Sequence, residues 1–518
     1  MRERPPRARR LAGAPSRLAA AGALAAMLAV LTAPVAAQEA ECVEVPGVNE
    51  ACPVWATDYD SPADGCTEEA AHQVTGPDAV YQAATRICGS SFDILVVAFG
   101  LDGTRRWAQA YAGPAGGRDH PFGLAVSPDG RRLFVAGSED TGEDTDWVTI
   151  ALDAATGERE WVANHAGPAA DDDEAWLVAA SEDGERVYVA GFDRTAATAA
   201  GLNVVTIAYD ASTGERAWIA RFDGDPQRID FPRAIGVSGD RVVVTGSSLG
   251  APPSQQDLQT VAYRDDRELG RAEELWRATY DGGDWDQPLA PCLTRTISFC
   301  LGLMGSVAVT GDTVAVAATS FNNPTTDDAV WSTVAYDLGS GERRWVRTFG
   351  DPTLQSKANA VAASPDGETI YVTGFTNDEL LWDGVGDSAT VAYDAETGQQ
   401  RWQASYALPA VDDAAGFSLA TDGETVYVGG SVQLWPADNA RVDVLTLAYD
   451  ADAGTQDWVA RYNRSASTPV GVGDHDSGHW IGLSPDGRRL VVGGGFARNF
   501  RLQDSGDYWD LGLLAYDV

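Results

Sequence analysis

One phrase recurs seven times along the chain and constrains the fold more than any other feature of the sequence. Its clearest copy runs Ala151-Leu-Asp-Ala-Ala-Thr-Gly-Glu-Arg-Glu-Trp161. The copies end on Trp107, Trp161, Trp218, Trp276, Trp345, Trp402 and Trp458, in steps of 54, 57, 58, 69, 57 and 56 residues. A self-similar period of about 20–50 residues or slightly more is typical of repeat architectures, in which each repeat is one supersecondary unit. We therefore expect one ring or array rather than several unrelated domains.

A second phrase lies between successive tryptophans and indicates what each unit folds into. It runs Ser127-Pro-Asp-Gly-Arg-Arg-Leu-Phe-Val-Ala-Gly137. It returns at Ser181–Gly191, Ser238–Gly246, Ser364–Gly374, Thr421–Gly430 and Ser484–Gly494, with a degraded copy at Thr310–Ala318. β-Branched and aromatic residues between Asp-Gly and Thr-Gly turns favour short strands, four in each unit. Four-stranded units repeated in this way predict an all-β fold, a β-propeller.

The count of units predicts the number of blades and the domain boundaries. Seven Ser-Pro-Asp-Gly-type units predict seven four-stranded blades, and eight is the alternative because 93–99 reads as one additional third strand. The chain ends on a third-type strand, Leu511–Val518, so we expect the missing fourth strand to come from Thr104–Trp107 and close the ring. The predicted domains are a signal peptide at 1–37, a cysteine-containing segment at 38–92 and the propeller at 93–518.

The Ala-x-Asp-x-x-x-Gly-x-x-x-Trp phrase is similar to the tryptophan-docking motif of PQQ-like (quinoprotein-type) propellers. The whole unit resembles the SBBP class of bacterial propeller repeats, and the resemblance covers about 93–518. It implies that the seven tryptophans dock one blade on the next. PQQ dehydrogenases of this kind typically carry a disulfide between adjacent cysteines, and this sequence contains neither a Cys-Cys pair nor a Cys-x-x-Cys-His haem motif. PQQ is therefore not an expected cofactor.

The first 37 residues have the pattern of an export signal. Six arginines between Arg2 and Arg17 precede an apolar run at 18–31, and Val35-Ala36-Ala37 offers a cleavage site. We expect a Sec-type signal, with Arg9-Arg10 as the basis of a twin-arginine alternative, and a secreted or periplasmic protein. No later apolar run reaches the length of a membrane span.

All six cysteines follow this signal, which favours disulfides in an oxidising compartment over zinc ligands. Cys292 and Cys300 are expected to bridge locally. Three pairings remain open for Cys42, Cys52, Cys66 and Cys88.

The net charge of the chain excludes two classes of partner. The full sequence carries −39, and removing 1–37 leaves 31 basic and 75 acidic groups, a net charge of −44. Nucleic-acid backbones and anionic lipid surfaces both require a basic footprint. A nucleic-acid-binding or membrane-adhering protein is therefore not expected.

Loop lengths indicate which face of the propeller carries function. Tight turns join the first strand to the second and the third to the fourth, whereas the other two classes of connection are long and variable and share the opposite face. Function is found more often on long loops over a rigid scaffold. The acidic runs 139–146 and 171–174 and the insertions at 284–300 and 471–479 all fall on this long-loop face.

Aspartates recur on that face at one position, eight residues before the Ser or Thr of the second phrase. They are Asp119, Asp173, Asp230, Asp413 and Asp476, and Gly302 and Ser356 break the series. One hypothesis is an acidic ring at the channel mouth that binds Ca²⁺ or another cation. The alternative, which the recurrence favours, is that each Asp bonds backbone amides where the chain crosses between blades.

The densest group of metal-ligand residues is Asp474, His475 and His479. Two histidines four apart can bind zinc when they lie on a helix, but glycine-rich neighbours place these two in a loop. Ser477 beside His479 suggests a hydrolase only by adjacency, because a triad is defined by geometry. A metal role for these residues is the minor hypothesis.

Taken together, these features predict an exported, non-catalytic, monomeric propeller that binds a protein or glycan through its acidic long-loop face. No catalytic residue is assigned. The alternatives are a PQQ-like oxidoreductase and a metal-dependent hydrolase or lyase that uses the acidic channel mouth. Ca²⁺ is the one cofactor left open.

Overall fold

A computed structural model gives the fold of the chain. The residues that it describes are 51–59, 66–169, 171–194, 202–222, 229–249, 256–282, 285–287, 307–323, 328–376, 386–407, 413–434, 441–463, 476–497 and 509–518. Within these ranges the regular structure is β-strand throughout, so no helix there could span a membrane. The all-β prediction is confirmed.

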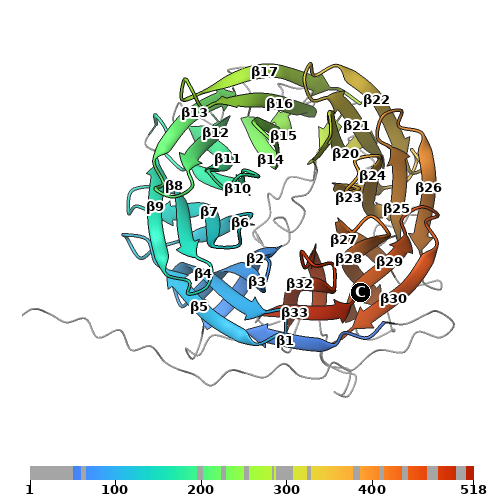
Figure 1. The fold of residues 1–518 in the computed structure, drawn as a ribbon, viewed down its shortest axis with the longest axis horizontal. Coiled ribbons are helices and arrows are strands. Elements are labelled where there is room, and N and C mark those ends of the chain that lie inside the picture. The colour runs from blue at the N-terminus through green and yellow to red at the C-terminus, as the bar shows by residue number, and fades with distance from the viewer. Residues whose placement is uncertain are drawn as a thin grey trace, which may run out of the picture. The chain divides into compact units, whose positions relative to one another are not determined.

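The strands form eight sheets arranged around a ring, with one strand of each sheet at the inner rim (Figure 1). We number these sheets as blades along the chain. From the inner strand outward, blade 1 is β2 (Cys66–Thr75), β3 (Ala79–Cys88), β4 (Ser91–Gly100) and β5 (Arg105–Tyr111). Blade 2 is β6 (His120–Val126), β7 (Arg132–Asp140), β8 (Thr145–Asp153) and β9 (Arg159–His165). Blade 3 is β10 (Glu174–Ala180), β11 (Arg186–Arg194), β12 (Leu202–Asp210) and β13 (Arg216–Phe222).

The next three blades follow the same order, with one variation. Blade 4 is β14 (Ile229–Ser238), β15 (Arg241–Leu249), β16 (Gln256–Asp266) and β17 (Arg271–Tyr280). In blade 5, β18 (Trp285–Gln287) and β19 (Val307–Thr310) both pair with β20 (Thr313–Asn323), followed by β21 (Asp328–Asp337) and β22 (Arg343–Phe349). Blade 6 is β23 (Ser356–Ala363), β24 (Thr369–Thr376), β25 (Asp387–Asp394) and β26 (Gln400–Tyr406). The insertion that contains Cys292 and Cys300 thus interrupts the inner strand of blade 5, and both cysteines lie outside the described residues.

The last two blades complete the ring. Blade 7 is β27 (Asp413–Thr421), β28 (Thr425–Leu434), β29 (Arg441–Asp450) and β30 (Gln456–Tyr462). Blade 8 is β31 (Asp476–Leu483), β32 (Arg489–Ala497), β33 (Trp509–Asp517) and β1 (Trp55–Tyr59). The strand that closes the ring is therefore β1, which pairs antiparallel with β33 from Trp55↔Ala515 to Tyr59↔Leu511.

Three expectations from the sequence are corrected by the observed strand pairing. The ring has eight blades, the alternative count, because 66–88 supply the first two strands of blade 1. The segment Thr104–Trp107 does not close the ring, since Arg105–Tyr111 is the fourth strand of its own blade. The ring also begins at β1 and not at residue 93, a boundary that falls inside β4.

One of the expected disulfides lies in blade 1. Cys66 and Cys88 face each other at the ends of β2 and β3 and are bonded. Cys52 also forms a disulfide, and Cys42 lies outside the described residues. A disulfide in a chain with this cysteine pattern indicates an oxidising compartment.

The repeated tryptophans dock each blade on the next. The Trp161 indole Nε1 donates to the Ala211 carbonyl at 3.1 Å, and its ring lies over Gly214, where a Cβ would come within 2.7 Å of the ring. Gly214 also has φ +72°, which a side chain would strain. The same pair of contacts joins Trp107 to Ala154 and Gly157, Trp276 to Leu338 and Gly341, Trp345 to Ala395 and Gly398, and Trp402 to Ala451 and Gly454.

Two further tryptophans also lie at blade junctions. Trp458 packs between Tyr427 and Tyr516, with its ring centroid 5.5 Å from that of Tyr516. Trp55 of β1 donates to the Leu101 carbonyl of blade 1 at 3.1 Å, so it is the docking tryptophan of blade 8. The hydrophobic core consequently lies between neighbouring blades, as in the cluster that joins Trp161 to Val187 and Tyr209.

A β-bulge in the inner strand explains why the second phrase ends on glycine. In seven blades the inner strand skips one residue in its pairing with the second strand, as between Pro121 and Gly123. The bulge brings an inner-strand carbonyl against the facing glycine, so that a Cβ on Gly137 would lie 2.3 Å from the His120 oxygen. The same clash, at 1.7–2.1 Å, would arise at Gly191, Gly246, Gly374, Gly430 and Gly494.

Candidate functional site

Two buried aspartates anchor the base of the long-loop face. Asp119 and Asp173 are each 0% exposed. Asp119 accepts hydrogen bonds from the backbone N–H groups of Gly113 and Asp140, the second at 2.9 Å. Asp173 does the same with Gly167 and Arg194, the second at 2.7 Å. Each carboxylate thereby ties the segment entering its blade to the end of the blade's second strand.

The other members of the predicted aspartate series lie less regularly. Asp476 is buried at the equivalent position on β31. Asp413 is displaced by one residue, because pairing of β27 with β28 places Ala414 where Asp119 stands. Asp230 occupies the expected position in the backbone of β14, and its side chain is outside the described set.

Sheet register adds one further member to the series, in blade 1, which lacks the second phrase from which the other positions are counted. Glu68 of β2 lies at the equivalent site of blade 1 and is buried. Ser356 occupies the site in blade 6, with its hydroxyl where a Cβ on Gly350 would come within 2.6 Å. Among the side chains that the structure describes, this position thus holds a buried acid in four blades, a serine in blade 6 and an alanine in blade 7. Within the described residues, no group of three or more His, Cys, Asp or Glu side chains is spaced to hold a metal ion.

Burial raises the pKa of several acids at and near these positions. Desolvation raises the pKa of Asp173 to about 6, opposed by its two backbone hydrogen bonds. Desolvation likewise raises the pKa of Asp119, Glu139, Asp146 and Glu174. A carboxyl whose pKa is higher in the folded chain than in the unfolded chain destabilises the fold as it ionises.

We expect the free energy of unfolding to fall as the pH rises from 4 to 6. In Asp173→Asn this fall should be smaller by about 1–2 kcal/mol. The native state holds the Asp173 proton up to about pH 6, whereas the unfolded state releases it near 3.8. Urea unfolding at a series of pH values measures the slope. Glu143→Gln, at an exposed position on the β7–β8 loop, is the control and should leave the slope unchanged. An unaltered slope in Asp173→Asn would contradict the assignment.

An acidic edge lies above these anchors on blades 2 and 3. Glu139 accepts from the Tyr111 hydroxyl at 2.6 Å and from the Asn164 amide. Asp146 is partly exposed, and the nearby Asp144 carboxylate adds to desolvation in raising its pKa. The exposed Glu143 lies between them on the β7–β8 loop.

The histidine cluster predicted from sequence is only partly within the described structure. Asp474 and His475 lie outside it. His479 is buried, its Nε2 lies 2.7 Å from the Ser477 hydroxyl, and its ring stacks on Phe417. Burial lowers the pKa of His479 to about 4, so the imidazole is neutral at pH 7. This side chain packs into the blade junction instead of projecting from a loop.

On the tight-turn face the acids are used to build turns. In four blades the serine of Ser-x-Asp-Gly donates to the aspartate two residues later, at 2.5–2.6 Å. The aspartates of the third-to-fourth strand turns accept N–H bonds from three residues along. Hydrogen bonds to Arg344 and to Thr397 respectively lower the pKa of Asp337 and of Asp394 to about 2. Part of the negative charge is therefore structural.

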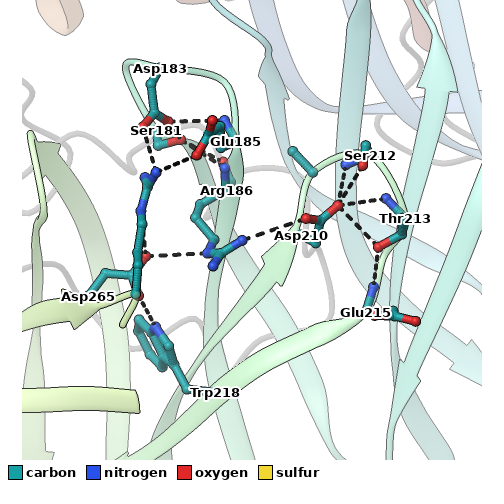
Figure 2. A network of polar contacts seen from close by, with 12 residues as sticks. Ser181, Asp183, Glu185, Arg186, Asp210, Ser212, Thr213, Glu215, Trp218 and Asp265 are labelled. Carbon is teal, nitrogen blue, oxygen red and sulfur yellow. Dashed lines mark hydrogen bonds and ion pairs between the residues drawn. The ribbon is translucent and has the colours of Figure 1, made fainter. Parts of the chain in front are cut away.

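At the junction of blades 3 and 4, a buried ion network takes the place of the usual hydrogen bond from the docking tryptophan to a backbone carbonyl (Figure 2). The longer turn after β16 brings Asp265 to Trp218, whose Nε1 donates to the carboxylate at 2.7 Å. Arg186 and Arg267 each place Nε 3.4 Å from the other oxygen, and the Tyr188 hydroxyl donates to it at 3.0 Å. The network satisfies its own charges, which points to blade docking and not to ligand binding.

Sequence reasoning did not recognise one set of inner-rim residues, those at the bulge itself, although it singled out one of them, His479, as a candidate metal ligand. They are Ala71, Phe122, Trp176, Arg233, Asn359, Phe417 and His479. Their signal is positional: in most of the blades they stand five residues before the Ser of the second phrase. Unlike the neighbouring repeat positions, this one differs in chemistry from blade to blade.

Comparison with known proteins identifies the repeat. The model of the family described as outer membrane protein assembly factor BamB matches at 93–252, 266–431 and 330–477, which together span more than half of the chain. No curated protein matches the sequence.

Among solved structures, the Dos1 propeller is similar with a TM-score of 0.51 and 11% identity, covering 90% of this chain and 95% of that one. A quinohemoprotein alcohol dehydrogenase from Pseudomonas putida HK5 has a TM-score of 0.44 and 14% identity, covering 91% and 76% of the two chains. Identities this low show the fold alone. The adjacent-cysteine disulfide typical of PQQ dehydrogenases has no counterpart, since the bonded Cys66 and Cys88 are 22 residues apart on a hairpin.

Proposed function

Because the chain belongs to the family described as outer membrane protein assembly factor BamB, we propose that it is an exported, non-catalytic propeller that binds a protein partner on its long-loop face. The family description supports a role in protein assembly. The Cys66–Cys88 disulfide supports an oxidising, extracytoplasmic location. The recurrent aspartates support a scaffold role, because both carboxylate oxygens of Asp119 and of Asp173 accept hydrogen bonds from backbone N–H groups.

The observation that carries the proposal is the acidic edge of blades 2 and 3. Its loops are anchored from below by Asp119 and Asp173, whereas Glu143 and Asp172 are exposed at the top. Within this edge Asp171 pairs with Arg194 and Asp172 accepts the Thr145 N–H, whereas Glu143 is exposed on the β7–β8 loop. An excess of negative charge on a rigid face attracts a partner of opposite sign and accelerates its association. The partner surface is accordingly basic.

The test is photo-crosslinking from single sites on the two faces of the exported protein. A photoreactive residue at Glu143 should give a defined protein adduct, and one at the exposed Glu182 of the tight-turn face should not. Neutralising the edge with Glu143→Gln and Asp144→Asn should lower the adduct yield about tenfold at low salt, because steering by charge is lost. Adducts from both faces alike, or none from Glu143, would contradict the proposal. A glycan captured in place of a protein would also contradict it.

A further inference from the structure

One cationic side chain at the inner rim of the ring forms no ion pair with the residues that the structure describes. Arg233 stands at the bulge of β14, the inner strand of blade 4 (Figure 1). Its Nε is buried and makes no hydrogen bond, and none of its nitrogens forms an ion pair with the described residues. Burial lowers the pKa of Arg233 to about 10. The guanidinium is nonetheless charged at pH 7, and an unpaired buried charge is costly.

The guanidinium instead lies against an aromatic shelf, formed by Trp176, Phe192 and Phe231. Its Cζ is 5.5 Å from the centroid of the Trp176 ring and 5.8 Å from that of Phe231. Trp176 and Phe231 stack almost parallel, with centroids 5.5 Å apart and an interplanar angle of 5°. Phe192 meets both rings edge-on. Cation–π contacts of this kind hold the guanidinium in place without using its N–H donors.

The bulge itself does not require an arginine. Blade 1 carries Ala71 at the same bulge, so the bulge forms with a methyl group there. The other polar residues at this position bond to the protein: Asn359 donates to the Gly416 carbonyl at 2.8 Å, and His479 pairs with Ser477. At Arg233, by contrast, the buried Nε makes no hydrogen bond with the described residues. A costly, unpaired charge that the scaffold does not need is typical of a binding site.

We propose that Arg233 and the aromatic shelf form a binding site for a small ligand that carries a carboxylate on a flat apolar body. The planar fork of a guanidinium matches a carboxylate with two parallel hydrogen bonds. The stacked rings of Trp176 and Phe231 offer the apolar surface beside it. The site lies on the inner strands β10 and β14 of neighbouring blades, where the Trp176 Nε1 also donates to Glu174 at 2.7 Å. It is distinct from the β7–β8 loop that carries the exposed Glu143.

The test compares benzoate with acetate, inorganic phosphate and neutral benzyl alcohol as probes, using calorimetry on the mature chain. Benzoate should bind, and Arg233→Met should weaken it about tenfold or more, because a charge-assisted hydrogen-bond pair is lost. Trp176→Phe should weaken benzoate but not acetate. The matched control is Arg131→Met, an exposed arginine of the tight-turn face, which should bind benzoate as the wild type does.

Thermal melting separates a ligand site from a structural one. Removing an uncompensated buried charge should leave the melting temperature of Arg233→Met equal to or above that of the wild type. Benzoate binding that survives in Arg233→Met would overturn the proposal, as would a wild type that binds none of the anions. Tighter binding of phosphate than of benzoate would contradict the proposal that the ligand has a flat apolar body.

Discussion

Replacing Trp345 with alanine is expected to lower the free energy of unfolding by about 3–5 kcal/mol, the usual cost of deleting a buried indole. Trp345 is 6% exposed, and its Nε1 donates to the Ala395 carbonyl of the next blade at 2.9 Å. The substitution leaves both a cavity and an unpaired carbonyl at the blade junction. Urea unfolding followed by far-UV circular dichroism measures the loss. The matched control is Thr348→Ala on the exposed side of the same strand, which should change stability by less than about 0.5 kcal/mol.

A second substitution tests whether the loss of stability in Trp345→Ala comes from the contact between the Trp345 ring and the next blade. Gly398 receives the Trp345 ring, has φ +67°, and would place a Cβ 2.5 Å from the indole Cδ2. Gly398→Ala therefore suffers both backbone strain and overlap with the ring. In a Trp345→Ala background the overlap disappears and about 1–2 kcal/mol of strain remains. Equal costs for Gly398→Ala in the two backgrounds would contradict docking of the ring on this glycine.

Removing β1 is expected to have the other large effect. A chain that begins at residue 61 loses Trp55 from the core between blades 8 and 1, which alone costs about 3–5 kcal/mol. It also exposes β33, whose residues Leu511 and Leu513 are buried in the intact ring, as an unpaired apolar edge. Open edges of this kind pair between molecules. We expect lower stability together with concentration-dependent association, measured by light scattering.

The control keeps β1 and removes only what precedes it. A chain that begins at residue 51 retains the pairing of Trp55–Tyr59 with β33. Cys52 is changed to serine in it, so that no free thiol remains. This chain should be monomeric and close to the full-length protein in stability. A milder probe is Thr57→Pro in the intact chain, because proline removes a ladder donor from the closing strand.

The repeat unit could be predicted because its causes are local. Asp-Gly turns, alternating β-branched residues and the Trp–Gly pair at positions such as Trp161 and Gly214 leave a signature within each repeat. The propeller fold and its PQQ-like character follow from that signature and are confirmed. The blade count was harder, because blade 1 replaces Ser-Pro-Asp-Gly by Gly76-Pro77-Asp78. The spacing Trp55-x-x-x-Tyr59, which matches Trp402-x-x-x-Tyr406, is the signal by which β1 could have been found.

The candidate sites depend on register, which the linear sequence does not show. Counting back from Thr421 aligns Asp413 with Asp119, but the turn that follows in blade 7 is two residues shorter, one on each side of its centre. Strand pairing therefore displaces Asp413 by one residue. Arg233 went unnoticed for a related reason. A bulge moves its residue out of the alternation of the strand, so neither periodicity nor composition indicates where that side chain points.

Hydrogen exchange of the β33 amides tests ring closure most directly. In the intact chain, backbone amides of 509–517 that pair with β1 should be protected to the same extent as those of the interior strand β12. In the chain that begins at residue 61, and locally in Thr57→Pro, protection on the β1 side of β33 should fall while β12 keeps its protection. Unchanged protection of 509–517 without β1 would contradict an eight-bladed ring closed by the N-terminal strand.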